Sequence, residues 1–165
     1  MTTTTKPLPW RSIPHMLRSV AQDVPDHPCI SFKRGGGYLC FSYKEFYTRV
    51  LMTARGLRKA GIKPQDKVAI LSENRAGWAI ADMGILAARA VSVPIYATST
   101  GHQAAFIIHH SGARIVFISS RQQYEKLLVV REQIPHVEMV ISFDRFLGEK
   151  SLPVYTLYQL SETSH

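Results

Sequence analysis

The sequence has no apolar run that approaches the roughly 20 residues of a membrane-spanning helix. Its opening segment, Met1–Lys6, has no apolar core and no cleavage pattern, so no secretory signal is visible. Apolar residues make up 45% and charged residues 19% of the 165 residues, which is the composition of one ordinary globular domain. We expect a cytoplasmic protein with a single domain over residues 1–165 and a flexible tail over residues 1–11.

Cysteine is also rare, because only Cys29 and Cys40 are present. They lie on adjacent strand-like segments on either side of three consecutive glycines. A turn centred on Gly36 would pair Phe32 with Cys40 and leave Cys29 further along the ladder. We therefore expect two free thiols, which suit a reducing compartment.

Acidic residues are scarce, and the formal net charge is +8. Nine of the 20 Lys and Arg residues fall between Lys33 and Lys67. Such a cluster could attract nucleic acid, an anionic membrane surface or a polyphosphate. The competing interpretation is the solvated face of a helix over Lys44–Ala60, whose apolar stripe has helical spacing. That stripe comprises Phe46, Val50, Leu51, Ala54 and Leu57. We favour the helix face and expect no nucleic-acid partner, while peripheral association with the inner face of a membrane stays open.

Apolar strand-like runs recur at nearly constant spacing. They begin near Val68, Val91, Ile115 and Met139. The spacing between successive starts is the length of one strand plus one crossover helix. Continuous apolar strands joined by helical crossovers predict an α/β fold with a mostly parallel sheet covered by helices on both faces. Two earlier segments, residues 29–33 and 38–43, predict a β-hairpin that precedes this sheet.

Several helices have recognisable boundaries. Ser12 and Pro14 predict the start of a helix over residues 15–21, and Thr100 with Gln103 has capping-box spacing before residues 104–110. Ser120 with Gln123 has the same spacing before residues 124–133, and Gly112 and Pro135 are plausible stops. The segment Trp78–Ala88 contains only one charged residue, Asp82, so we expect a helix buried on more than one face. Pro94 predicts that the following strand ends, bulges or lies at a sheet edge.

Two loops could bind a ligand. Thr98–Gly101 follows a strand and precedes a helix, so it could form an anion nest, but it lacks the Walker pattern and a helix cap accounts for it. Ser72–Arg75 lies at the carboxyl edge of the sheet, where α/β folds bind ligands. Its competing interpretation is a helix entry, with Ser72 or Asn74 as the cap and Trp78 as a packing anchor.

Other side chains offer no chemistry at a recognisable spacing. His109 and His110 fall at a helix end, where the dipole favours them, and no metal-ligand spacing surrounds them. No Ser-His-Asp set can be nominated. We assign no catalytic, cofactor-binding or metal-binding residue in this chain.

Taken in order, five segments resemble the AMP-forming acyl-CoA synthetases, most closely the long-chain fatty-acid–CoA ligases. Residues 43–46 look like the "T-Y-x-E-L" helix entry, and residues 56–71 are similar to "G-L-x-x-x-G-[IV]-x-x-G-D-x-V-A-I-L". Residues 72–82 are similar to "S-E-N-R-P-E-W-x-I-A-D", residues 93–99 to "V-P-I-Y-P-T-S" and residues 110–114 to "H-S-G-A-[RK]". The resemblance covers residues 12–145 and implies the first subdomain of the N-terminal domain of an adenylate-forming enzyme.

The chain departs from the family at three positions. Gln65 replaces a usual glycine, Ala97 a common proline, and Arg89 the glycine of an alanine-glycine-alanine turn. If residue 89 is left-handed, its side chain costs roughly 1 kcal/mol. The substitution could also mark relaxed selection.

The resemblance implies a two-step reaction that uses ATP, Mg²⁺, a fatty acid and CoA. The family's phosphate loop, adenine motif, acyl tunnel and catalytic lysine lie downstream of the similar segments. We therefore expect a fragment whose partner is the remainder of the synthetase, with no cofactor of its own and no activity alone. Two alternatives stay open: an interaction module that has lost catalysis and self-associates through exposed apolar surface, and an independent nucleotide-binding α/β domain.

Overall fold

The computed structural model describes residues 10–162, so the tail expected over residues 1–11 lies almost wholly outside the described residues. The elements that come before the main sheet are α1 (Ile13–Asp23), β1 (Pro28–Arg34), β2 (Gly37–Ser42) and α2 (Tyr43–Lys59). The main α/β unit contains β3 (Lys67–Ser72), α3 (Ala76–Ala87), β4 (Val91–Tyr96), α4 (Gly101–Ser111), β5 (Ile115–Ile118), α5 (Arg121–Val129), the 3₁₀ turn η1 (Arg131–Gln133), β6 (Met139–Ser142), β7 (Val154–Thr156) and α6 (Leu157–Glu162).

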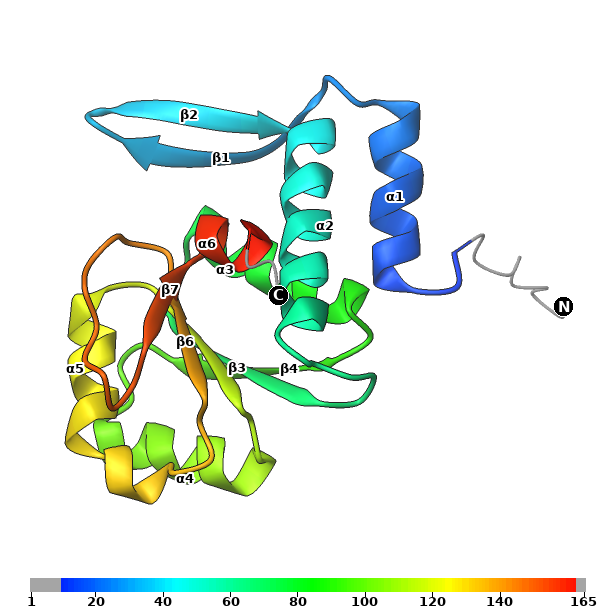
Figure 1. The fold of residues 1–165 in the computed structure, drawn as a ribbon. Helices are drawn as coiled ribbons and strands as arrows, with labels where there is room; N and C mark the ends of the chain where they lie inside the picture. The colour runs from blue at the N-terminus through cyan, green and yellow to red at the C-terminus, as the bar shows by residue number, and fades with distance from the viewer. Residues whose placement is uncertain (1–9, 163–165) are drawn as a thin grey trace, which may run out of the picture.

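The five main strands form a parallel sheet in the order β4-β3-β5-β6-β7, with helices on both faces (Figure 1). On one face, Leu71, Val116 and Ile118 pack with residues of α4 and α5. On the other face, Ile70 and Phe117 pack with residues of α2, α3 and α6. Both predicted layers are therefore confirmed, and each strand buries side chains in two directions, as its continuous apolar sequence requires.

The β1–β2 hairpin projects away from the main sheet above α6 (Figure 1). Its expected register was wrong by one residue, because Phe32 pairs with Leu39 and not with Cys40. The turn is formed by two glycines, Gly35 and Gly36, with φ values of 57° and 82°. Two left-handed residues make the tight hairpin turn that matches strand twist, so the centre lies between the glycines. Cys29 falls at a register irregularity, and both thiols are free, as expected.

The helix α2 follows its predicted stripe. Phe46, Val50, Ala54 and Leu57 are buried, Leu51 is half-buried, and Arg55, Arg58 and Lys59 are exposed. Arg49 lies with its guanidinium carbon 4.1 Å from the centre of the Phe41 ring. The basic side chains of this helix therefore cover its solvent face, as the helix-face interpretation predicted.

The predicted helix boundaries were partly right. The capping box of Thr100 and Gln103 is present, and Gly112 ends α4 in the left-handed conformation. The box expected at Ser120 was wrong, because this residue forms no side-chain cap and Gln123 is buried. The helix α5 ends at Val129, before the expected end at residue 133, because a 3₁₀ turn follows and both Val130 and Ile134 are buried on either side of it.

Two non-glycine residues in the described part of the chain have positive φ: Gln65 at 73° and Arg89 at 66°. Arg89 is thus left-handed, which is the condition under which we expected its side chain to carry a cost. The two residues also contact each other, since the Gln65 N–H donates to the Arg89 carbonyl at 2.9 Å. The pair lies at the amino ends of β3 and β4, and Pro94 lies within β4, an edge strand of the sheet, as predicted. Within residues 10–162, no helix is long and apolar enough to cross a membrane.

Candidate functional site

The carboxyl edge of the sheet has a topological switch point between β3 and β5. These strands are neighbours in the sheet, but α3 follows β3 on one face and α5 follows β5 on the other. Such a point opens a crevice outside the strand ends, where α/β proteins bind ligands. The segment Ser72–Arg75 lies here, as the sequence predicted. Neither expected cap is used, because α3 begins after Arg75 without a side-chain cap.

Arg75 joins three strand ends at this edge. Its guanidinium donates to the Ser119 carbonyl after β5, with the Nη1–O distance at 2.6 Å. It also forms a two-pronged pair with Asp144 after β6, at 2.7 and 3.2 Å. The bonds with Asp144 raise the pKa of the guanidinium. Because the two side chains are 38% and 47% exposed, the pair contributes no more than about 1 kcal/mol, but it fixes the spacing of the three loops.

A second set of bonds ties α5 to the loop after β4. The buried Gln123 amide donates to Glu73 Oε1 at 2.8 Å and to the Ala97 carbonyl at 3.2 Å. Lys126 donates to the carbonyls of Ala97 at 2.7 Å and Ser99 at 3.0 Å. The sequence nominated Gln123 only as a helix-capping residue, and it did not nominate Lys126 or Asp144. For Gln123 a signal was available in the sequence, because it lies among apolar positions of α5. An amide that is buried among apolar side chains needs a polar partner, so its burial would have predicted a tertiary hydrogen bond.

The loop Thr98–Gly101 contains a helix cap. It lies beside Lys126, whose ammonium already donates to two backbone carbonyls. Thr100 Oγ1 accepts from the Gln103 N–H at 3.3 Å, and Gln103 Oε1 accepts from the Thr100 N–H at 2.9 Å. The ammonium of Lys126 contacts this loop by donating to those two backbone carbonyls, so these bonds occupy the lysine in place of a bound anion. The cap interpretation therefore accounts for the loop.

Glu73 lies directly after β3 at this edge. Burial acts to raise its pKa, but the Ser119 hydroxyl, its own backbone N–H, the Gln123 amide and the charge of Arg75 lower it below the ordinary value. The Ser119 hydroxyl stands near the carboxylate without the geometry of a full hydrogen bond. The lowered pKa keeps Glu73 an anion at neutral pH, where it accepts from the Gln123 amide.

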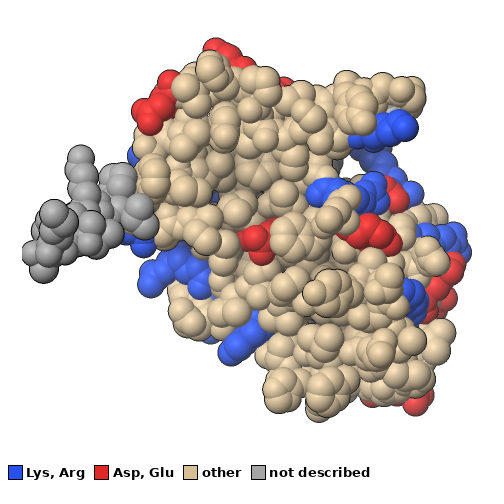
Figure 2. All heavy atoms as spheres, turned by 180° about the vertical axis from the view of Figure 1, so that it is seen from behind, with Lys and Arg blue, Asp and Glu red and all other residues tan. Residues whose placement is uncertain are grey.

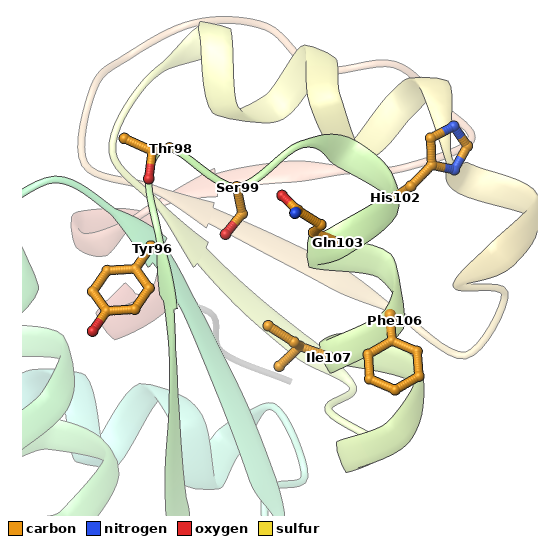
Figure 3. A pocket seen from close by; sticks show the side chains of 7 residues that line it. All are labelled: Tyr96, Thr98, Ser99, His102, Gln103, Phe106 and Ile107. Carbon is orange, nitrogen blue, oxygen red and sulfur yellow. The ribbon is translucent and has the colours of Figure 1, made fainter.

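Two hollows border this edge. One, of about 840 Å³, lies between the β1–β2 hairpin and the start of α3, and Arg75 and Asp144 form part of its wall. The other, of about 710 Å³, lies between β4 and α4. Figure 3 shows Ser99, Gln103 and Ile107 pointing into this second hollow, with Tyr96 on its opposite side. No Lys or Arg is among the described residues that line it, so it offers no counter-charge to a triphosphate.

Three histidines lie at the end of α4 and in the loop after η1. Within residues 10–162, no three His, Cys, Asp or Glu side chains are placed to hold a metal ion. His110 stacks on Phe106 with ring centres 5.9 Å apart, and His109 meets His136 edge to face at 5.6 Å. His109 and His110 lie in the last turn of α4, where the sequence predicted a helix end.

The fold has counterparts of known structure. It superposes on a putative long-chain-fatty-acid CoA ligase from Rhodopseudomonas palustris with a TM-score of 0.77 and 19% identity, over 90% of this chain and 36% of that one. It superposes on the anthranilate CoA ligase AuaEII with a TM-score of 0.82 and 15% identity, over 98% of this chain and 29% of that one. These similarities establish the fold.

The sequence also has curated relatives. It is 30% identical over 149 residues to the long-chain-fatty-acid–CoA ligase ACSBG2 of Xenopus laevis, and 27% identical over 155 residues to ACSBG1 of Homo sapiens. These matches cover 90% and 94% of this chain but only 20% and 21% of the relatives, so the chain spans about a fifth of their length. The family model described as AMP-binding enzyme matches residues 17–161. The chain therefore belongs to the AMP-binding enzyme family.

Proposed function

We propose that this chain is the first scaffold subdomain of a long-chain fatty-acid–CoA ligase. Such an enzyme joins a fatty acid to AMP at the expense of ATP and then passes the acyl group to CoA. The names of the curated relatives support the substrate class. One observation carries the proposal: the charged side chains at the carboxyl edge of the sheet are hydrogen-bonded to other groups of the same chain. These side chains are Glu73, Arg75, Lys126 and Asp144.

The residues described here do not fit ATP and Mg²⁺. A triphosphate needs several unpaired donors and cations around its oxygens, whereas Lys126 donates to two backbone carbonyls and Arg75 to a carboxylate. We therefore derive no catalytic step on these residues. Their role is to hold three loops in register for polypeptide that supplies the reactive groups, and the partner is the remainder of the ligase.

The test is acyl-adenylate formation by the 165-residue protein with ATP, Mg²⁺ and palmitate. We expect no turnover above a control without protein, and the Xenopus laevis ligase serves as the positive control under the same conditions. A calorimetric titration with ATP and with CoA should likewise show no tight binding. Turnover by the 165-residue protein would overturn the proposal, and tight ATP binding would favour an independent nucleotide-binding domain.

A binding module without catalysis is a second candidate, because large apolar side chains lie on the surface of the second hollow. Tyr96 is 84% exposed and Phe106 is 71% exposed. Exposed aromatic groups around a hollow suit a protein partner or a second copy. Sedimentation at increasing concentration tests self-association, and a Phe106→Ser variant should abolish it.

The two free thiols support the cytoplasmic compartment proposed from the sequence, and the basic surface supports peripheral association with a membrane.

A further inference from the structure

The two borders of the β1–β2 hairpin differ in how they are protected. A strand at the border of a sheet presents unpaired main-chain groups, which natural sheets guard with proline, lysine or a bulge. The strand β1 has all three devices, in Pro28, Lys33 and the irregular register between Pro28 and Ile30. The strand β2 has none of them, because residues 37–42 contain no proline and no charged residue and no extra residue interrupts their pairing. The free border of β2 is therefore open to another strand.

This border also faces away from the rest of the molecule. In Figure 1, β1 lies between β2 and the body that contains α3 and α6, and β1 contacts α3. In Figure 2 the hairpin projects at the upper right, with an uncharged upper border and Lys/Arg atoms beneath it. Because the chain has a net charge of +8, two copies meet little repulsion where an uncharged border approaches another.

The turn of the hairpin decides which main-chain groups of β2 point outward. A two-residue turn makes the flanking pair, Arg34 and Gly37, a hydrogen-bonded pair. Hydrogen-bonded and non-hydrogen-bonded pairs alternate in an antiparallel ladder. Leu39 therefore bonds inward to β1, whereas Tyr38 and Cys40 direct their N–H and C=O groups outward. In the part of the chain that the structure describes, no hydrogen bond from another element reaches these outward groups.

The outward groups are complementary to themselves. When a second β2 runs antiparallel, Tyr38 of each copy faces Cys40 of the other, and the two pairs exchange about four main-chain hydrogen bonds. Leu39 then faces Leu39 of the second copy on the two-fold axis, at a non-hydrogen-bonded pair where side chains approach closely. A register shifted toward α2 loses a bond, because the N–H of Ser42 already donates to Glu45 Oε2 at 2.8 Å.

We propose that β2 is a self-association surface, at which two copies of this chain join their hairpins into one four-stranded antiparallel sheet. The contact is isologous, so it closes at a dimer. It covers Tyr38, which is 79% exposed, and Leu39, which is 47% exposed. Two short strands bury little surface, so the dimer is weak and reversible. This inference is independent of the ligase proposal, since it concerns main-chain pairing and not turnover.

Cysteine cross-linking tests the register. In a Cys29→Ser, Cys40→Ser background, Leu39→Cys places two thiols on the axis, where Cα atoms about 4.5 Å apart suit a disulfide. Tyr38→Cys is the matched control, because its two copies lie diagonally, roughly 8 Å apart and beyond disulfide reach. We expect Leu39→Cys to form a covalent dimer at least roughly tenfold faster. Random collisions favour the more exposed Tyr38, so equal or reversed rates would overturn the register.

Two measurements on the untagged 165-residue protein under reducing conditions test the association itself. Sedimentation equilibrium should show a monomer–dimer equilibrium, and Leu39→Arg should weaken it by roughly tenfold or more, because like charges meet on the axis. Phe106→Ser, which removes an aromatic group of the second hollow, should leave it unchanged, and circular dichroism verifies that both variants are folded. The amides of Tyr38 and Cys40 should gain protection from hydrogen exchange as the concentration rises, whereas the Leu39 amide is protected throughout.

Three results would overturn the contact. The first is a protein that stays monomeric up to its solubility limit. The second is a dimer that Leu39→Arg does not weaken. The third is a dimer that Phe106→Ser abolishes, which would place the association at the second hollow and not at the hairpin.

Discussion

The left-handed pair of Gln65 and Arg89 predicts that two glycine substitutions stabilise the protein. A side chain at φ near 70° costs roughly 1–2 kcal/mol, whereas glycine loses about 0.4–1 kcal/mol through the larger entropy of the unfolded chain. Both side chains are exposed, so little packing is lost. The bond between them joins backbone atoms and survives the change. We expect each of Gln65→Gly and Arg89→Gly to gain about 0.5–1 kcal/mol.

Urea unfolding measures this gain. With a slope of about 2 kcal/mol per molar urea, each variant should raise the midpoint by roughly 0.25–0.5 M. The double variant also reports coupling, because the two residues are in contact and their effects need not add. Arg55→Gly, at an exposed position inside α2, is the matched control and should lose about 1 kcal/mol. If both left-handed variants are destabilised as the control is, the strain inferred from their φ values does not exist.

Three further predictions concern ion pairs and packing. The Arg114 guanidinium lowers the pKa of Glu138, so the pair should stabilise the fold above the ordinary carboxyl pKa and lose this contribution as the pH falls through the lowered value. Arg114→Ala should flatten that part of the stability–pH curve by under about 1 kcal/mol, because Glu138 is 57% exposed. Asp144→Asn should lower the free energy of unfolding by about 0.5–1 kcal/mol and increase hydrogen exchange in the loops that Arg75 joins. Gly84→Ala would place a Cβ 2.5 Å from a side-chain carbon of α2 and should cost about 1–3 kcal/mol in thermal unfolding, despite the better helix propensity of alanine.

The sequence predicted the elements whose signals are local and repeated. The four long strands, the hairpin and the core helix follow from apolar periodicity, and Gly112 and the Thr100 box mark real helix ends. The strand β7 and the helix α6 were not predicted. A strand of three residues is too short to show a period, and α6 is defined by Leu160 packing against α2, which is a contact between distant parts of the chain.

The errors at the carboxyl edge have the same origin. Ser120 and Gln123 have the spacing of a capping box, but a partner at long range, Glu73, takes the glutamine side chain. Asn74 is a good capping residue by type, yet α3 begins one residue later, where Arg75 reaches over to Ser119 and Asp144. Spacing along the chain identifies a residue that can cap a helix. The tertiary partner decides whether it does.

The two outer strands of the five-stranded sheet limit how copies of this protein can meet at that sheet. Pro94 removes a main-chain donor from the middle of β4, and β7 offers only three residues of backbone. Neither border is a good template for an incoming strand, since proline and shortness are the devices by which natural sheets discourage edge-to-edge growth. Copies that meet at the borders of this five-stranded sheet should therefore do so through side chains and not by strand pairing.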